Sequence, residues 1–243
     1  MLAGAGATAG SVYLHWLPCR TAWFTGTVLN GNRPSPEAAD PEAWEACLGR
    51  MDTGLPFPYP PEPAETTVGA SGLGVVAMAL VGVAWMIFVL GMRWQWWTKA
   101  VASLPTAVTL VAAGVSAAAV YDTGRAEEDG SDWLWYGMDL AALVAFVAIC
   151  AWQKDFRGQR LIRTMVVLWG VTAFGFTHLI FDYGFMATFS TLNWDTPPLT
   201  GTLSAASLAL SAFVTVVVAL NLPRKRLRQD RQPVAQPSRT LPA

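Results

Sequence analysis

The stretch SGLGVVAMALVGVAWMIFVLG, Ser71–Gly91, decides the class of this protein. It carries no charged residue and is close to the ~20 residues that an α-helix needs to cross the hydrocarbon core of a bilayer. Its residues do not alternate between apolar and polar, as those of a transmembrane β-strand would. Four further stretches are similarly long and nearly free of charge: Leu104–Tyr121, Leu134–Trp152, Leu161–Phe181 and Thr200–Leu222. The pattern predicts an all-α bundle, because a membrane-spanning segment must satisfy its own backbone hydrogen bonds.

Composition agrees with a membrane protein. The chain has 243 residues, of which 53% are hydrophobic and only 14% are charged, whereas soluble domains carry roughly 25% charged residues. Arginine outnumbers lysine by 13 to 3, and Ala, Gly and Val are abundant. This bias is typical of a high-GC bacterial genome, so we expect a bacterial source.

Basic residues are unevenly distributed along the chain. Twelve of the 16 lie in Met92–Ser103, Gln153–Thr164 and Pro223–Ala243, where only two acids accompany them. The positive-inside rule makes these segments cytoplasmic. The C-terminus is then cytoplasmic, and residues 18–70, 122–133 and 182–199 are extracytoplasmic.

The first apolar segment, Leu2–Leu17, is shorter than the others and rich in Gly and Ala. No basic residue precedes it, although a secretory signal normally has a positive start. An extracytoplasmic 18–70 segment is most simply explained if Leu2–Leu17 crosses the membrane from a cytoplasmic N-terminus, as a sixth transmembrane helix. A cleaved signal, and a helix whose start lies upstream, remain open alternatives.

These assignments predict four regions. They are transmembrane helix 1 or a signal-anchor (1–17), an extracytoplasmic loop (18–70), a five-helix transmembrane bundle (71–222) and a basic, disordered cytoplasmic tail (223–243). The tail carries five basic residues directly after the last predicted helix: Arg224, Lys225, Arg226, Arg228 and Arg231. We expect them to contact anionic lipid, at about 1 kcal/mol per residue, and we expect no nucleic-acid partner.

The predicted outer loop contains two cysteines, Cys19 and Cys47. Extracytoplasmic compartments favour disulfides, so we predict a bond between them. The capping signals around Cys47 predict a short helix over Pro41–Leu48. The proline-rich Leu55–Pro63 predicts an extended polyproline II arm, interpreted as a spacer. Cys150, near the cytoplasmic end of its helix, is expected to act as a small apolar residue.

Four of the ionisable residues on the outer side of the predicted helices are candidates for a polar pocket: His15, Asp139, His178 and Asp182. Ionisable groups in hydrocarbon are functional candidates by default. Asp139 lies about 7–8 Å inside its helix and His178 about 4–5 Å from the outer end of another, at 1.5 Å per residue. If they converge, they line an outward-facing polar pocket under the 18–70 loop, with Leu192–Gly201 at its rim. For His178 and Asp182, a hydrogen bond at the end of a helix is the favoured alternative.

The motifs of common enzymes are missing. The sequence has no H-E-x-x-H, Walker, G-x-S-x-G or C-x-x-C pattern, and we predict no metal and no cofactor. The favoured function is therefore a non-enzymatic accessory or assembly subunit of a membrane or envelope complex, with a protein partner.

Two alternatives remain at this point. A small-molecule or ion transporter would use the polar pocket, although we expect neither midplane charges nor broken helices, which such transporters commonly have. A membrane-embedded enzyme would use His178 and Asp182 as an acid–base pair, and a haem protein would place its haem between His15 and His178.

Overall fold

The computed structural model describes residues 1–21, 40–53, 68–121, 132–152, 159–189 and 197–229. Within these ranges the chain is helical and contains no strand. The elements are α1 (Leu2–Trp16), the 3₁₀ helix η1 (Leu17–Thr21), α3 (Pro41–Thr53), α4 (Val68–Gly91), α5 (Trp96–Ala102), α6 (Leu104–Tyr121), α7 (Asp132–Trp152), α8 (Gln159–Val171), α9 (Phe176–Ala187) and α10 (Thr202–Gln229).

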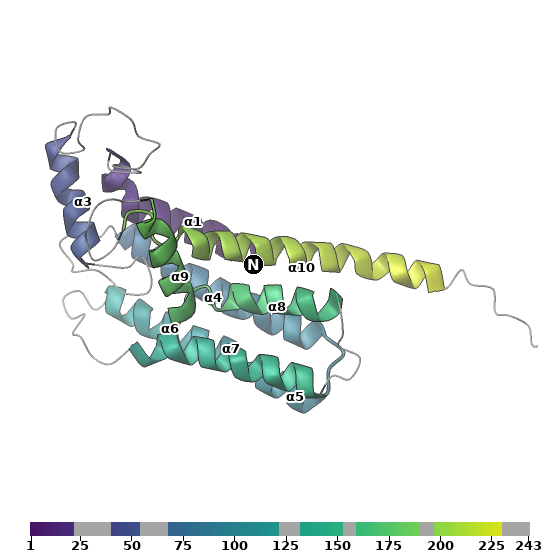
Figure 1. Ribbon diagram of the computed structural model, residues 1–243. Helices are drawn as coiled ribbons and strands as arrows, with labels where there is room; N and C mark the ends of the chain where they lie inside the picture. Colours follow the sequence, from purple (N-terminus) through teal and green to yellow (C-terminus); the bar gives the residue numbers. More distant parts are fainter. Residues whose placement is uncertain (22–39, 54–67, 122–131, 153–158, 190–196, 230–243) are drawn as a thin grey trace, which may run out of the picture.

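The long helices run side by side in one bundle (Figure 1). α4 packs against α6, α6 against α7 and α8 against α10, while α1 lies along α4 and α10. α3 sits at one end of the bundle beside η1, and α9 runs across the same part of the molecule (Figure 1). α5 and the start of α8 lie at the opposite end.

Three segments are long and apolar enough to cross a membrane: Ala70–Gly91, Trp96–Ala118 and Trp133–Trp152. They indicate a membrane protein. The prediction of six spans is not confirmed. α1 has 15 residues, which is about 22 Å of helix at 1.5 Å per residue. The apolar part of α10, Thr202–Val217, is also shorter than the three candidate spans.

The predicted continuous helix over Leu161–Phe181 is wrong. The chain forms two helices there, Leu161–Val171 and Phe176–Ala187, with an 82° bend between them. Counted as one broken span, this pair brings the number of candidate spans to four.

Small residues and hydroxyls bring the helices of the first half close together. A Cβ on Gly4 of α1 would lie 2.9 Å from Val81 Cγ2 of α4, so only glycine permits this approach. The Ser11 hydroxyl donates to the Ala70 carbonyl at 2.6 Å. The Thr106 hydroxyl of α6 donates to the Gly82 carbonyl of α4 at 3.1 Å. These bonds supplement backbone ladders that are already complete within each helix.

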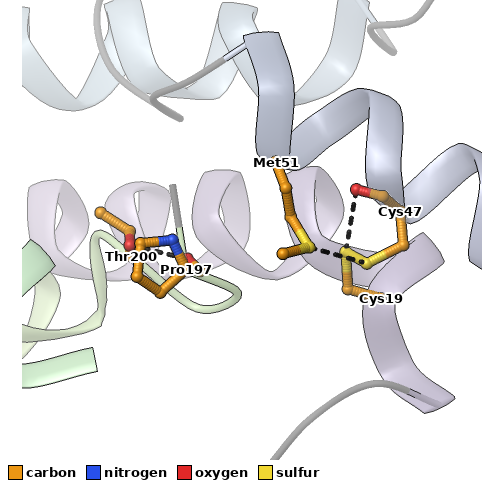
Figure 2. The surroundings of a disulfide bond; sticks show 5 residues. All are labelled: Cys19, Cys47, Met51, Pro197 and Thr200. Carbon is orange, nitrogen blue, oxygen red and sulfur yellow. Dashed lines mark hydrogen bonds between the residues drawn. A yellow bond between two sulfur atoms is a disulfide. The ribbon is translucent and has the colours of Figure 1, made fainter. Parts of the chain in front are cut away.

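The predicted disulfide is confirmed. Cys19 of η1 and Cys47 of α3 are bonded, with their Cα atoms 4.7 Å apart, and neither residue is exposed. The Met51 sulfur packs 3.7 Å from Cys47 Sγ (Figure 2). The bond ties α3 to the end of α1, and its burial is typical of a structural disulfide. Cys150 on α7 is a free, exposed thiol.

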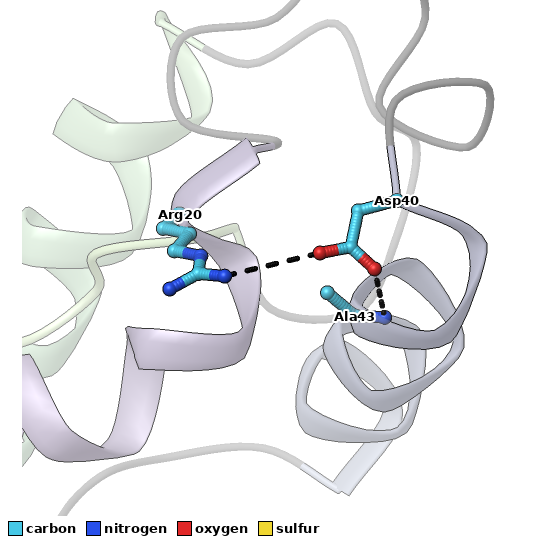
Figure 3. A network of polar contacts seen from close by, with 3 residues as sticks. All are labelled: Arg20, Asp40 and Ala43. Carbon is cyan, nitrogen blue, oxygen red and sulfur yellow. Dashed lines mark hydrogen bonds and ion pairs between the residues drawn. The ribbon is translucent and has the colours of Figure 1, made fainter.

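α3 begins where the sequence predicts but ends later. Asp40 accepts a hydrogen bond from the Ala43 backbone N–H at 3.1 Å, and its other oxygen lies 3.9 Å from Arg20 Nη2 (Figure 3). Gly49 does not end the helix, which continues to Thr53. Met51 explains the difference, because the extra turn buries its side chain completely against the disulfide.

The structure describes only part of the predicted tail and none of the predicted polyproline arm. The backbone of α10 continues through Pro223 to Gln229, so the first part of the predicted disordered tail is helical. The polyproline arm, Leu55–Pro63, and Arg231 of the tail lie outside the described residues.

Candidate functional site

The break between α8 and α9 is the most polar part of the bundle interior. At the end of α8 the Thr172 hydroxyl donates to the Trp169 carbonyl at 2.8 Å, and Gly175 N–H donates to the Thr172 carbonyl at 2.7 Å. These tight turns replace the α-helical pattern. Gly175 then adopts an extended conformation, with φ −86° and ψ 167°, and α9 starts in a new direction. A break in an apolar environment leaves backbone groups that need other partners.

His178 supplies a partner for the end of α8. Its Nε2 lies 2.9 Å from the Trp169 carbonyl oxygen. A carbonyl only accepts, so Nε2 carries the proton in this arrangement. The imidazole also packs on the Trp169 indole, with ring centroids 4.1 Å apart, and it is 2% exposed. His178 therefore ties α9 back onto the last turn of α8.

Asp139 of α7 caps the start of α9. Its Oδ2 accepts hydrogen bonds from the Thr177 backbone N–H at 2.7 Å and from the Thr177 hydroxyl at 2.8 Å. Gly175 is the N-cap residue of α9 and has no side chain to fill this role. A carboxylate from a neighbouring helix thus takes the place of the usual capping side chain, at the positive end of the helix dipole.

Gly175 is required for this cap. A Cβ at this position would overlap the Asp139 carboxylate and would lie 3.1 Å from the Thr172 carbonyl oxygen. Gly175 is itself buried. Its φ is open to any residue, so the demand for glycine comes from the close approach of Asp139 rather than from backbone strain.

Asp182 of α9 caps the start of α10 in the same way. Its carboxylate accepts from Leu203 N–H at 3.2 Å, from Ser204 N–H at 3.0 Å and from the Ser204 hydroxyl at 3.2 Å. Gly201, with φ 102°, precedes α10 and again has no capping side chain. Asp182 is 1% exposed, and its two bonds with Ser204 are buried.

The described end of the predicted rim, residues 197–201, forms a tight turn before α10. Thr200 donates through both its N–H, at 3.3 Å, and its hydroxyl, at 2.7 Å, to the Pro197 carbonyl (Figure 2). Leu199 has a φ of 68°, the left-handed region. Trp16 Nε1 of α1 donates to the Thr200 carbonyl at 2.8 Å, which anchors the end of α1 to this turn. The remainder of the predicted rim, residues 192–196, is outside the described residues.

Three of the four candidate polar residues lie in α9 or contact it: Asp139 at its start, His178 in its first turn and Asp182 one turn later. Asp139 accepts from the backbone N–H and the hydroxyl of Thr177, the residue before His178. His178 and Asp182 both lie inside α9, a helix separate from α8. His15 is buried in α1, with its ring edge-on to Trp16 at 4.7 Å.

Several residues of this site were not anticipated from the sequence. Gly175, Thr177 and Ser204 carry no chemistry on their own and do not stand out in an apolar segment. A signal was present in the stretch TAFG, Thr172–Gly175, which combines a hydroxyl that competes for backbone carbonyls with a glycine suited to begin a helix.

Comparison with known proteins found no matching family model, no similar curated protein and no similar solved structure. Within the described ranges, no cluster of three or more His, Cys, Asp or Glu side chains has a geometry that would hold a metal ion. Assignment of a function therefore rests on the contacts of the site itself.

Proposed function

We propose that the protein is a non-catalytic, multi-pass membrane protein that acts as an accessory or assembly subunit of a membrane or envelope complex. One observation carries this proposal. Asp139, His178 and Asp182 each bond a different helix end, at α9, α8 and α10 respectively. Side chains that hydrogen-bond backbone groups at helix ends fix the arrangement of the helices. A fixed arrangement of helices suits a subunit whose role is to bind a partner protein.

These bonds argue against the enzyme and haem alternatives. A general base needs its reactive nitrogen within reach of a substrate, but Nε2 of His178 faces the Trp169 carbonyl. Asp182 is surrounded by the first turn of α10. An absorption spectrum of the purified protein with a Soret band that shifts on reduction would support haem and contradict the proposal.

The membrane orientation that we propose keeps both termini in the cytoplasm and the 18–70 loop outside. The arrangement in Figure 1 supports it, because α5 and the start of α8, which adjoin the basic segments, share one end of the bundle, and α3 lies at the other. Residues of the first segment and of Thr200–Leu222 would add further crossings to the candidate spans. Accessibility of single introduced cysteines to a membrane-impermeant thiol reagent would test this orientation.

The part of the molecule that we propose as the contact with a partner protein is the outer cap, formed by η1 and α3. It projects from the end of the bundle (Figure 1), and the buried Cys19–Cys47 bond holds it in place. Closing a loop of this length should stabilise by about 3–4 kcal/mol on the chain-entropy model. A cap fixed in this way can bind without first being ordered.

Purification from source membranes in mild detergent, followed by mass spectrometry, tests the proposal. We expect a stoichiometric protein partner that is lost in the Cys19→Ser/Cys47→Ser variant and retained in Cys150→Ala, the matched control. A wild-type protein that purifies alone, folded and with all its bundle contacts, would contradict it.

A transporter remains a second candidate, because the structure contains a broken helix that the sequence does not predict. Transporters commonly place half-helix N-termini at their substrates. In this chain the N-terminus of α9 already holds the Asp139 carboxylate. Ion or solute flux into proteoliposomes that is abolished by Asp139→Asn, with folding unchanged, would favour transport over assembly.

A further inference from the structure

The two faces of α9 have opposite character. Its buried face repeats every four residues and consists of His178, Asp182 and Met186, which are 2%, 1% and 5% exposed. Its outer face is apolar and is formed by four large side chains, Ile180, Phe181, Tyr183 and Phe185. Each of these is between 41% and 59% exposed. The polar side of this helix is therefore turned inward, the reverse of an amphipathic helix on a soluble protein.

The outer face of α9 is continuous with the exposed faces of two neighbouring helices. The Phe176 ring of α9 packs on Tyr136 of α7, with centroids 4.5 Å apart. The Phe181 ring packs edge-on to Trp169 of α8, at 6.2 Å. Tyr136 and Trp169 are both exposed, at 54% and 42%. α7 carries one of the candidate spans, so its exposed apolar side chains face lipid.

The direction of α9 sets its place in the bilayer. α8 runs with the bundle, and α9 is bent from it by 82°, so α9 lies nearly parallel to the membrane plane. Asp139, which caps its start, is in the second turn of α7, about 10 Å from the end of that helix at 1.5 Å per residue. Asp182 fixes the other part of α9 to the first turn of α10. With the membrane orientation proposed above, on which this inference rests, the two anchors place α9 at the level of the outer headgroup–acyl boundary.

We propose that α9 is an interfacial helix whose face of Ile180, Phe181, Tyr183 and Phe185 binds phospholipid of the outer leaflet. Aromatic side chains favour this level of a bilayer, and a tyrosine ring suits a surface with one apolar and one wet side. Uncharged side chains over the whole face, together with its continuity with the lipid-facing surface of α7, favour lipid over a protein partner. Helices at this boundary bury their apolar face by about 5–10 Å.

The experiment is spin-label accessibility in phosphatidylcholine–phosphatidylglycerol vesicles. Phe181→Cys and Phe185→Cys are made separately in the full-length Cys150→Ala protein, with the native disulfide intact. Leu143→Cys, at an exposed position on α7, is the lipid-facing control, and Arg93→Cys, at an exposed position after α4, is the water-facing control. Power saturation compares collisions with oxygen, which concentrates in lipid, and with a nickel chelate, which stays in water.

We expect labels at 181 and 185 to favour oxygen over nickel, as the label at 143 does, but at a shallower depth. Labels that favour nickel, as at 93, would place α9 in water and overturn the proposal. Labels that are immobile and shielded from both reagents would mean that a second copy of the chain covers this face, and would also overturn it. Each result is independent of whether the outer cap binds a partner, because only the vesicle-reconstituted protein is present.

Discussion

The two halves of the bundle satisfy their backbones in different ways. α4, α6 and α7 run without a sharp bend through the candidate spans, so nearly all of their interior backbone groups bond within the same helix. α8, α9 and α10 change direction twice within the bundle, and their ends are satisfied by side chains from other helices. Asp139 caps α9, Asp182 caps α10, and His178 bonds the end of α8.

The difference explains why Asp139, His178 and Asp182 gather at the ends of α8, α9 and α10, although Asp139 itself lies on α7. A continuous helix needs no outside hydrogen-bond partner in lipid, whereas a broken one exposes groups that cost several kcal/mol each if left unpaired. Both capped helices follow a glycine, Gly175 or Gly201, which cannot cap with its own side chain. The carboxylates are thus explained by the path of the chain, without a substrate.

Asp182→Ala should have the largest effect. Three donors in the first turn of α10 would lose an acceptor that is 1% exposed, and each lost partner costs about 1–3 kcal/mol where it is buried. We expect the free energy of unfolding in detergent to fall by about 3 kcal/mol or more. Asp182→Asn, which keeps one acceptor oxygen, should lose less. Equal stability of wild type and Asp182→Ala in thermal unfolding would contradict the claim that the second half depends on side chains that cap helix ends.

Gly175→Ala should have the second-largest effect on stability. The added methyl group would overlap the Asp139 carboxylate, and overpacking of this kind costs about 1–3 kcal/mol. Gly184→Ala on the same helix is the matched control, since a Cβ there meets nothing within 4 Å. We expect that control to be neutral or to gain about 0.5–1 kcal/mol from helix propensity. Equal changes in the free energy of unfolding for the two variants would show that the close approach of Asp139 to Gly175 is unimportant.

His178→Leu should have an intermediate effect, a loss of about 1 kcal/mol. The Trp169 carbonyl would keep its bonds from the Thr172 hydroxyl and N–H, so it would not become unsatisfied. His178→Gln, whose amide can donate to the same carbonyl, should recover part of the loss in the same unfolding assay. A loss in His178→Leu larger than that in Asp182→Ala would mean that His178 has a role beyond this bond.

Thr106→Val in the first half should have the smallest effect. The Gly82 carbonyl that accepts from Thr106 also belongs to the backbone ladder of α4, and interhelical bonds of this kind average about 0.6 kcal/mol in a membrane protein. Chemical unfolding should detect little change. A loss comparable to that of Asp182→Ala would show that the first half also depends on bonds between helices.

Helical class, the Cys19–Cys47 bond and the start of α3 follow from the sequence because each depends on local or compositional rules. Apolar length predicts helices, and the cap at Asp40 followed by Pro41 predicts where α3 begins. The 82° bend does not follow from the sequence, because threonine and glycine, the residue types at positions 172 and 175, also occur in unbroken membrane helices. Only the three-dimensional arrangement shows that Asp139 reaches α9, from a position 38 residues away in the chain.

Amide hydrogen exchange tests the central claim, that the carboxylates of Asp139 and Asp182 cap helix ends. It would be measured in detergent on wild type, Asp139→Ala and Asp182→Ala. We predict that Asp139→Ala loses protection at Thr177 and keeps it at Leu203 and Ser204, and that Asp182→Ala shows the reverse. Unchanged protection at these amides in both variants would contradict the account and return Asp139 and Asp182 to the list of candidate functional groups.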